Sequence, residues 1–308
     1  MKKLFLTTIF FFIAISTTFA QKFTGIFQEN DEFAGSRFEI RVPKLPDKLD
    51  FAGEVVPINR PDVKRAVQRE VLTTSNMHTA TTLSLIRSSR WIPIIKPILK
   101  SYGIPEDFIY LCFAESGMNP EAISTAKAAG LWQIMAGTAK DYGLETGSNV
   151  DLRYNVELAT EAACKILKKS YDSLGNWTLA AASYNIGLGG IRRRLKIQQV
   201  DDYWDLNLPE ETMRYVSRIL SFKLLLENPS KYGFFIDDED YFPPFENFIL
   251  LTLQDTEIDW CALAKRYGTN YKMLRILNPW IRSYSYENKG RHSYIVKIPT
   301  KLFKEKGY

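Results

Sequence analysis

One glutamate stands where a helical pattern would otherwise place an apolar residue. Phe108, Leu111 and Cys112 lie on one stripe of a helix predicted to begin at Pro105, and the next position on that stripe is Glu115. Burial disfavours the charged carboxylate, and the negative end of the helix dipole acts in the same direction, so both raise the pKa of Glu115. A carboxyl group kept protonated near neutral pH is a general acid, which is the chemistry predicted here. The alternative is a core glutamate paired with an arginine.

Three further stretches of polar and aromatic residues follow this helix. With the glutamate they read, in order, Glu115-Ser116-Gly117, Gly130-Leu131-Trp132-Gln133, Ser183-Tyr184-Asn185 and Glu211-Thr212-Met213-Arg214-Tyr215-Val216. Each later residue taken singly also has a structural interpretation: a helix-terminal residue for Gln133, a cap for Asn185, a first-turn acid for Glu211, and core aromatics for Tyr184 and Tyr215. Their order along the chain favours one shared site.

In this order the four stretches resemble the motifs of the lytic murein transglycosylases with a goose-lysozyme-like fold. The likeness is greatest to the membrane-bound type D enzymes, which couple such a domain to LysM modules. The family pattern is Glu-Ser, then Gly-Leu-Met-Gln, then Ala-Tyr-Asn, then Glu-Thr-x-x-Tyr-Val. The resemblance implies that Glu115 is the single catalytic acid and base. It assigns substrate contacts to the other matching positions: Ser116, Gln133, Tyr184, Asn185, Glu211 and Tyr215.

Two positions depart from the family pattern. Trp132 stands where methionine is usual, and Ser183 stands where alanine is usual. Because the neighbouring polar residues stay in register, we expect a groove of altered shape with its chemistry retained.

The resemblance implies a reaction on peptidoglycan glycan strands, at the β-1,4 bond between N-acetylmuramic acid (MurNAc) and N-acetylglucosamine (GlcNAc). Ordinary glycosidases use two carboxylates, whereas Asp141, Glu145 and Asp151 fall in polar stretches and are interpreted as solvated. A single acid suits a route in which the substrate's acetamido group assists and the muramyl O6 hydroxyl closes a 1,6-anhydro ring. Two alternatives stay open: a hydrolytic muramidase, and a non-catalytic peptidoglycan-binding scaffold.

The elements that must position these residues are helices. No stretch between Pro61 and Glu227 alternates as a strand would. The sequence predicts an all-α domain over residues 59–227, which the resemblance makes lysozyme-like, preceded by an extended arm over 21–58. The candidate helices lie near 61–74, 76–89, 91–102, 105–116, 135–142, 155–174, 177–186 and 208–226.

Beyond a predicted linker at 228–247, which contains Pro229, Gly233, Pro243 and Pro244, the pattern changes. The sequence predicts a small β-α-α-β module over 248–308, with its strands and helices at 248–253, 257–267, 270–277 and 293–298. The protein is therefore expected to be mainly α, with strands confined to this module.

The module resembles a LysM domain, a fold that binds N-acetylglucosamine-containing glycans. The resemblance rests on residues 262–269 and 274–279. The module departs from the family in Gln254-Asp255, where Gly-Asp is usual, and in a long basic segment at 281–292, where a short turn is usual. Glycan binding and a role as a packing cap on the first domain both stay open.

The first twenty residues have the order of a secretory signal peptide. Lys2 and Lys3 precede an apolar run, and small residues lead to Ala20, so cleavage is expected before Gln21. The alternative is an uncleaved anchor, although the apolar run is shorter than the roughly 20 residues of a membrane span. We predict an exported protein of the periplasm or cell envelope, with peripheral envelope association as an option.

Charge and cysteine usage exclude other classes. Of the formal charge of +5, Lys2 and Lys3 supply two, which leaves +3 on residues 21–308. This is far from the basic stripe of a nucleic-acid binder, so no nucleic acid is expected. Three widely spaced cysteines and two isolated histidines predict no disulfide framework, no metal and no cofactor. Cys112 and Cys164 are interpreted as buried thiols, with a bridge between them as the alternative.

Overall fold

The computed structural model of the protein describes residues 42–301 and residue 303. The predicted signal peptide at 1–20 and most of the predicted arm at 21–58 lie outside these residues. The elements below all belong to one of the two units into which the chain divides, Pro43–Tyr308. Among the described residues, no helix has the length and apolar character needed to cross a membrane.

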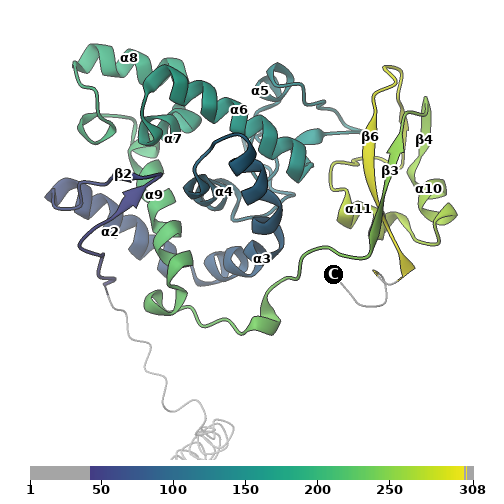
Figure 1. Cartoon of the computed structure of the whole chain (residues 1–308), viewed down its shortest axis with the longest axis horizontal. Coiled ribbons are helices and arrows are strands. Elements are labelled where there is room, and N and C mark those ends of the chain that lie inside the picture. Colours follow the sequence, from purple (N-terminus) through teal and green to yellow (C-terminus); the bar gives the residue numbers. More distant parts are fainter. Residues whose placement is uncertain (1–41, 302, 304–308) are drawn as a thin grey trace, which may run out of the picture. The chain divides into compact units, whose positions relative to one another are not determined.

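The chain up to the predicted linker is helical, as expected (Figure 1). Asparagines begin two of its helices, since the side chains of Asn155 and Asn176 accept hydrogen bonds from the N–H groups of Leu158 and Leu179. The helices are α2 (Pro61–Asn76), α3 (His78–Ser101), α4 (Ile109–Ser116), α5 (Ala136–Asp141), α6 (Val156–Leu174), α7 (Trp177–Ile186), α8 (Leu188–Gln198) and α9 (Glu210–Glu227).

Two helices predicted as separate are one. The stretches 76–89 and 91–102 form the single helix α3, which continues through Pro93 and Pro97. A proline removes one helical N–H and crowds the preceding turn, so it usually ends or bends a helix. Here the core-facing side of α3 stays packed on both sides of the prolines, which offsets the lost hydrogen bonds.

One helix and one helix start were not predicted. Helix α8 begins at Leu188, directly after Gly187 and with Gly189 and Gly190 in its first turn, and glycines at this density are typical of loops. The helix predicted from Pro105 begins as a short 3-10 helix, Glu106–Phe108, before α4 takes over at Ile109.

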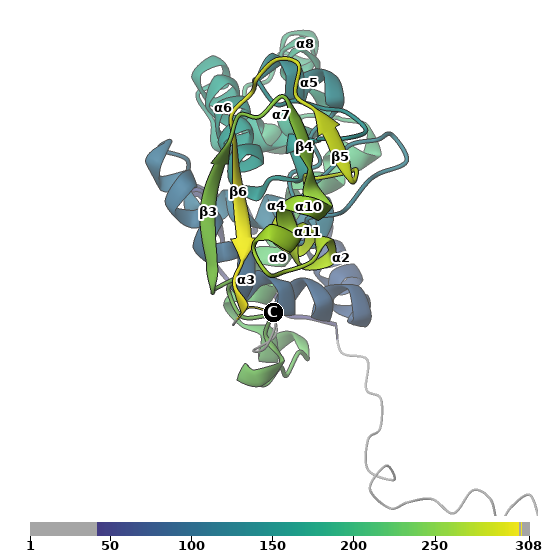
Figure 2. The same cartoon turned by 90° about the vertical axis from the view of Figure 1, so that its right-hand side faces the viewer.

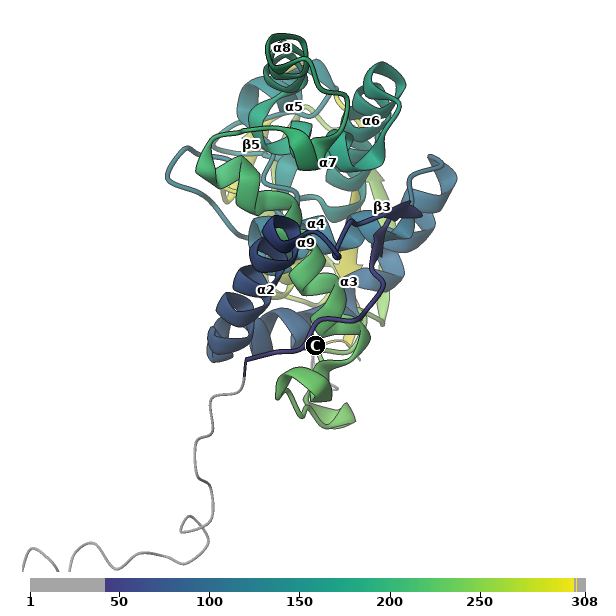
Figure 3. The ribbon, with the colours of Figure 1, turned by 90° about the vertical axis from the view of Figure 1, so that its left-hand side faces the viewer.

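Helix α4 lies among the other helices, and its Leu111, Cys112 and Phe113 are buried (Figure 1). It packs against α3 and α9, and α9 lies along α2 (Figure 3). The last turn of α4, which carries Glu115, is therefore held beside α9. Cys112 and Cys164 are free, buried thiols, so the alternative of a bridge between them is not realised.

A hairpin within the predicted arm holds the start of α7. Its strands are β1 (Asp50–Phe51) and β2 (Glu54–Val55). Glu54 accepts hydrogen bonds from the N–H groups of Trp177, at 2.5 Å, and Thr178, at 2.9 Å. A carboxylate at a helix N-terminus satisfies unpaired N–H groups and compensates the helix dipole. The hairpin thus fixes the helix that carries Tyr184 and Asn185.

The C-terminal module has the predicted β-α-α-β order (Figure 2). Strand β3 (Phe248–Leu253) pairs antiparallel with β6 (Tyr294–Pro299), and α10 (Trp260–Arg266) and α11 (Tyr271–Leu277) come between them in the chain.

A second strand pair in the module was not predicted. It joins β4 (Glu257–Asp259) to β5 (Ser285–Glu287). The helix expected from residue 257 begins only at Trp260, because the Asp259 carboxylate caps it by accepting a hydrogen bond from the Ala262 N–H.

The core of this module includes residues of the helical part. Ala129, Val150 and Tyr154 join a cluster with Trp280 and Ile281. Val150 and Ile281 form an isolated β-bridge, and the N–H of Asp151 donates to the Trp280 carbonyl at 3.0 Å. The module therefore packs on the segment between α4 and α6, as the packing alternative required.

This packing explains why two carboxylates interpreted as solvated are not. Asp151 is only 5% exposed and forms a 2.7 Å salt bridge with Arg153. Glu145 accepts hydrogen bonds from the hydroxyls of Tyr286 and Tyr294 of the module. The module covers this polar stretch, which local sequence polarity does not reveal, whereas Asp141 is exposed as expected.

Because the module and the helical part share a core, a cavity where they pack together is expected to lower the free energy of unfolding strongly. Ile281 is fully buried there, whereas Ile295 of the same module is 61% exposed. We expect Ile281→Ala to lower the free energy of unfolding by about 2–4 kcal/mol, and Ile295→Ala by less than about 1 kcal/mol. Urea denaturation followed by tryptophan fluorescence measures both. Equal effects of the two substitutions would contradict the shared core.

Candidate active site

Glu115 lies in the last turn of α4, partly buried, directly before the glycine that ends the helix. Gly117 has φ +57°, and a Cβ atom there would lie 2.8 Å from Oγ of Ser84. Both the left-handed backbone and the close neighbour therefore favour glycine at this position. Ending the helix here leaves the Glu115 side chain at the edge of the helical core.

The hydroxyl of Tyr215, on α9, donates a hydrogen bond to Oε1 of Glu115. Burial raises the pKa of Glu115 to about 7, although the Tyr215 hydrogen bond and the charge of Arg218 lower it, and Glu211 raises it. Desolvation is thus the largest influence, as the stripe on α4 predicted. The alternative of a glutamate bonded to an arginine is wrong for Glu115, because its hydrogen-bond partner is a tyrosine.

The predicted residues of α7 lie on the same side of the core. The Tyr184 hydroxyl donates to the carbonyl of Trp132 at 2.8 Å, and burial together with the nearby Glu115 charge raises the pKa of Tyr184. Asn185 accepts a 2.7 Å hydrogen bond from the Thr212 hydroxyl, so it joins α7 to α9. This role of Thr212 was not predicted from its place in the motif.

Gln133 lies in the loop before α5, in a left-handed conformation with φ +46°. Its side-chain amide donates to the carbonyls of Gly130, at 2.9 Å, and Ala122, at 3.2 Å. The interpretation of Gln133 as a helix-terminal residue is therefore wrong, since α5 begins only at Ala136.

A buried arginine holds this loop in place. Arg153 pairs with Asp151 through two hydrogen bonds, of 2.9 and 2.7 Å. Its remaining amine donates to the carbonyls of Lys127, at 2.8 Å, and Ile134, at 3.1 Å. Arg153 thus clamps both ends of the turn that presents Gln133, and Asp151 connects this clamp to the C-terminal module.

The two departures from the family pattern lie in the core. Trp132 is fully buried, and its indole N–H donates to the Thr160 hydroxyl at 2.8 Å. Ser183 is 4% exposed and bonds to the Ser170 hydroxyl at 2.8 Å. The expectation of an altered groove shape is therefore wrong for both side chains, because neither faces a groove.

A buried glutamate that the sequence analysis missed organises the arginines beside the site. Glu70 of α2 is 1% exposed and lies 2.8 Å from Arg214 and 3.8 Å from Arg218. It continues a stripe of Val63, Val67 and Val71, so the spacing that revealed Glu115 would also have revealed it. A core glutamate paired with arginine, the alternative interpretation of Glu115, is therefore found at Glu70.

A cavity of about 530 Å³ adjoins the end of α4, between α2, α3 and α9. Its walls include Ala114, Ser116 and Gly117, which flank Glu115 in the chain, and the cationic side chains of Arg87, Arg214 and Arg218. The Ser116 hydroxyl itself donates back to the Cys112 carbonyl at 3.0 Å.

The predicted site residues are thus brought together in part. Tyr215 donates a hydrogen bond to Glu115. The charge of Glu115 raises the pKa of Tyr184, and the charge of Glu211 raises the pKa of Glu115. Asn185 is attached to the same two helices. Gln133 and Ser116 hydrogen-bond to nearby backbone carbonyls instead of to Glu115.

With this geometry in place, two family models match the chain. Residues 93–207 match the transglycosylase SLT domain, and residues 251–302 match the soluble lytic transglycosylase C-terminal LysM-like domain. The chain contains an SLT domain and a LysM-like domain. The matches confirm the predicted fold class, a mainly helical lysozyme-like domain followed by a small module with strands. The SLT match ends before α9, which supplies Tyr215.

Curated relatives carry related names. The chain is 32% identical over 197 residues to membrane-bound lytic murein transglycosylase D of Escherichia coli K12, covering 61% of this chain and 42% of that protein. It is 29% identical over 140 residues to membrane-bound lytic murein transglycosylase C of Glaesserella parasuis, covering 38% of each. The chain therefore spans less than half the length of these relatives.

Solved structures with similarity include two lytic transglycosylases. The lytic transglycosylase Slt of Pseudomonas aeruginosa aligns with TM-score 0.36 at 22% identity, over 50% of this chain and 26% of that one. The 70 kDa soluble lytic transglycosylase of E. coli aligns with TM-score 0.39 at 16% identity, over 70% of this chain and 42% of that one.

The turn beneath Gln133 predicts a sharp difference between two glycines. A Cβ at Gly130, where φ is +79°, would lie 2.0 Å from the Arg153 carbonyl oxygen, whereas one at Gly189 of α8 meets nothing within 4 Å. We expect Gly130→Ala to lower the free energy of unfolding by more than about 2 kcal/mol, and Gly189→Ala to change it by less than about 1 kcal/mol. Thermal and urea unfolding test this pair. Equal stability of the two variants would contradict the described turn.

The raised pKa of Glu115 predicts a pH-dependent stability. The pKa is 4.5 for the free side chain and about 7 in the folded protein. The stabilising contribution of the protonated group is complete below pH 4.5 and is lost as the pH rises through 7, to a limit of about 3 kcal/mol. Glu115→Gln cannot ionise, so its free energy of unfolding should exceed that of the wild type most at pH 8 and least near pH 5. A constant difference across this range would contradict the shift.

Proposed function

We propose that this protein is a peptidoglycan lytic transglycosylase that cleaves the β-1,4 MurNAc–GlcNAc bond and leaves 1,6-anhydro-MurNAc ends. The observation that carries the proposal is a single carboxyl group, Glu115, with a pKa of about 7, beside a cavity of the SLT-bearing unit. The names of its relatives, lytic murein transglycosylases, supply the substrate class.

Glu115 acts first as the acid. Because the Tyr215 hydroxyl donates to Oε1, that oxygen is held in place and Oε2 carries the proton. Oε2 protonates the glycosidic oxygen, the bond from that oxygen to C1 of MurNAc breaks, and the acetamido group of the same sugar stabilises the positive charge at C1.

Glu115 then acts as the base. The muramyl O6 hydroxyl attacks C1, its proton goes to the Glu115 carboxylate, and the anhydro ring closes without consumption of water. The Tyr215 hydroxyl and the charge of Arg218 both favour the carboxylate formed in the first step. A pKa of about 7 suits a group that must give a proton and take one back at neutral pH.

A hydrolytic mechanism would need a second carboxylate, free to activate water, in the cavity beside Glu115. Among the described residues that line it, Glu70 is the carboxylate, and its oxygens are occupied by Arg69, Arg214 and Arg218. Water activation by such a paired group is unfavourable, which supports the transglycosylase over the muramidase.

The proposal includes the roles of the remaining predicted residues. Ser116, Gln133, Tyr184, Asn185 and Glu211 position the glycan around Glu115, and the protein acts in the periplasm or cell envelope after export. The export signal in this proposal is the predicted signal peptide at residues 1–20.

Mass spectrometry of products released from purified peptidoglycan tests this proposal. We expect the wild type to release muropeptides one water lighter than hydrolytic ones, and Glu115→Gln to lower the rate by more than about a thousandfold. Glu115→Gln removes only the transferable proton, so its control is retention of the wild-type circular dichroism spectrum.

The other outcomes distinguish the alternatives. Products of hydrolytic mass would make the protein a muramidase. Absence of products from a folded wild type, on several kinds of peptidoglycan, would leave the non-catalytic scaffold. Full activity of Glu115→Gln would remove Glu115 from the mechanism.

A further inference from the structure

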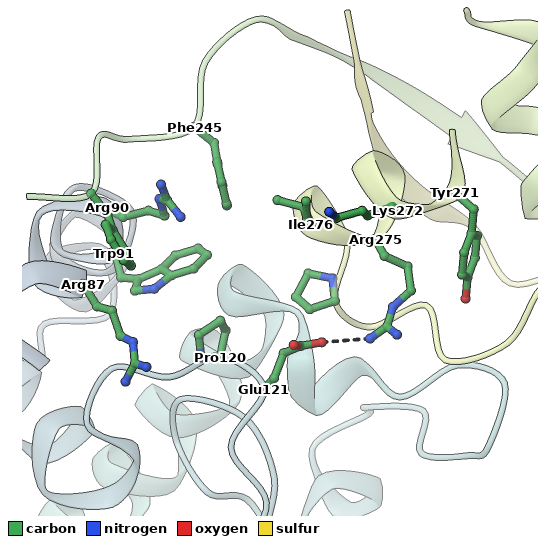
Figure 4. Close-up of a pocket in the computed structure, with 12 residues that line it drawn as sticks. Arg87, Arg90, Trp91, Pro120, Glu121, Phe245, Tyr271, Lys272, Arg275 and Ile276 are labelled. Atoms are coloured by element: carbon green, nitrogen blue, oxygen red, sulfur yellow. Dashed lines mark hydrogen bonds and ion pairs between the residues drawn. The ribbon is translucent and has the colours of Figure 1, made fainter. Parts of the chain in front are cut away.

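A second cavity, of about 470 Å³, lies between α3 and the LysM-like module (Figure 4). One wall comes from α3, the opposite wall from α11, and the loop after α4 forms the floor with Pro120 and Glu121. Aromatic side chains contribute to three sides, among them Trp91 of α3, Phe245 of the linker and Tyr271 of α11. None of the residues assigned to catalysis lines this cavity.

The charge of this cavity is strongly positive. Its lining holds Arg87, Arg90, Lys272 and Arg275 against one carboxylate, Glu121. Arg90 is held in the wall, because its Nε donates to the Pro243 carbonyl at 2.9 Å and its guanidinium lies 4.3 Å from the ring centre of Phe245.

Arg275 leaves part of its hydrogen-bonding capacity unused. One terminal amine donates to Glu121 at 2.8 Å, but its Nε is buried and has no acceptor within the described part of the chain. A buried N–H without an acceptor costs free energy, and a carboxylate oxygen is the acceptor that a guanidinium bonds most strongly. With four cationic side chains against one carboxylate, and with aromatic walls, the cavity is suited to a carboxylate-bearing ligand that also offers apolar surface.

The cavity shares one wall residue with the cavity beside Glu115. Arg87 lines both cavities, and its guanidinium donates to the carbonyl of Gly117 at 3.3 Å, two residues beyond Glu115. Pro120 and Glu121 follow in the same loop. A polymer bound beside Glu115 therefore has a basic, aromatic-walled recess within reach of the chain segment that ends α4.

We propose that this recess is a subsite for the carboxylate-bearing stem peptide of the peptidoglycan strand being cleaved. The inference rests on the proposed function and adds a preference for strands that retain their peptides. In the sugar backbone itself, the lactyl group that carries the peptide is the one group that would bind a cation. The free carboxylates of the stem peptide would bind the four cationic side chains of the recess.

Two matched substrates and two matched variants test the subsite. The substrates are glycan strands with stem peptides, prepared by opening the cross-links of purified sacculi, and the same strands stripped of peptides by an amidase. The variants are Lys272→Glu, at an exposed residue that lines the recess, and Lys265→Glu, at an exposed residue of α10 that does not.

We expect the wild type to cleave peptide-bearing strands with a higher kcat/KM than stripped strands, by about fivefold or more. Lys272→Glu should reduce kcat/KM on peptide-bearing strands about five- to tenfold and leave stripped strands unchanged within about twofold. Lys265→Glu should match the wild type on both. Unchanged thermal unfolding of both variants confirms that folding is retained.

The results that would overturn the inference are distinct from those that would overturn the function. Cleavage of both substrates at equal rates by all three proteins, or an equal loss by Lys272→Glu on both substrates, would remove the subsite and leave the transglycosylase intact. Failure of the wild type to cleave either substrate would overturn the proposed function and the subsite with it.

Discussion

The hydrogen bond between Tyr215 and Glu115 joins α9 to α4. It holds a carboxyl group that would be more stable in water than in the protein interior. Keeping that group partly buried costs free energy, which the surrounding packing must supply. Helix α9 is held against α2 by the Glu70–Arg214 salt bridge, and against the 3-10 helix that precedes α4 by Lys223, which contacts Asp107 at 2.8 Å. Helix α4 in turn ends at Gly117, whose left-handed backbone favours glycine. The helices around the site thus serve to hold one proton-carrying group in place.

Much of this arrangement is visible in the sequence, because its periodicity is local. The stripe that places Glu115 on a buried face is a property of one helix, and the raised pKa follows from that face. The β-α-α-β order of the module likewise follows from short apolar runs and caps. Most of the helices before the linker also lie close to their predicted ranges.

What the sequence did not reveal depends on contacts between distant segments. Asp151 and Glu145 lie in a polar stretch, and only the module that covers them makes them structural. Trp132 and Ser183 look like groove residues from their motif, but the helices behind them bury both. Glu70 is a different case, because its spacing was readable, and it was missed because no motif drew attention to α2.

The clamp made by Arg153 has a consequence for the order in which the chain becomes functional. Chains are made from the amino terminus, so Glu115 is available about a hundred residues before Tyr215. Asp151, which pairs with Arg153, also donates a backbone hydrogen bond to the carbonyl of Trp280 in the C-terminal module. Local folding of the α4 region alone therefore leaves the proton-carrying group without its hydroxyl partner and the Gln133 turn only partly held. The Glu115–Tyr215 hydrogen bond and the Gln133 turn are therefore complete only after the module that contains Trp280 has been synthesised.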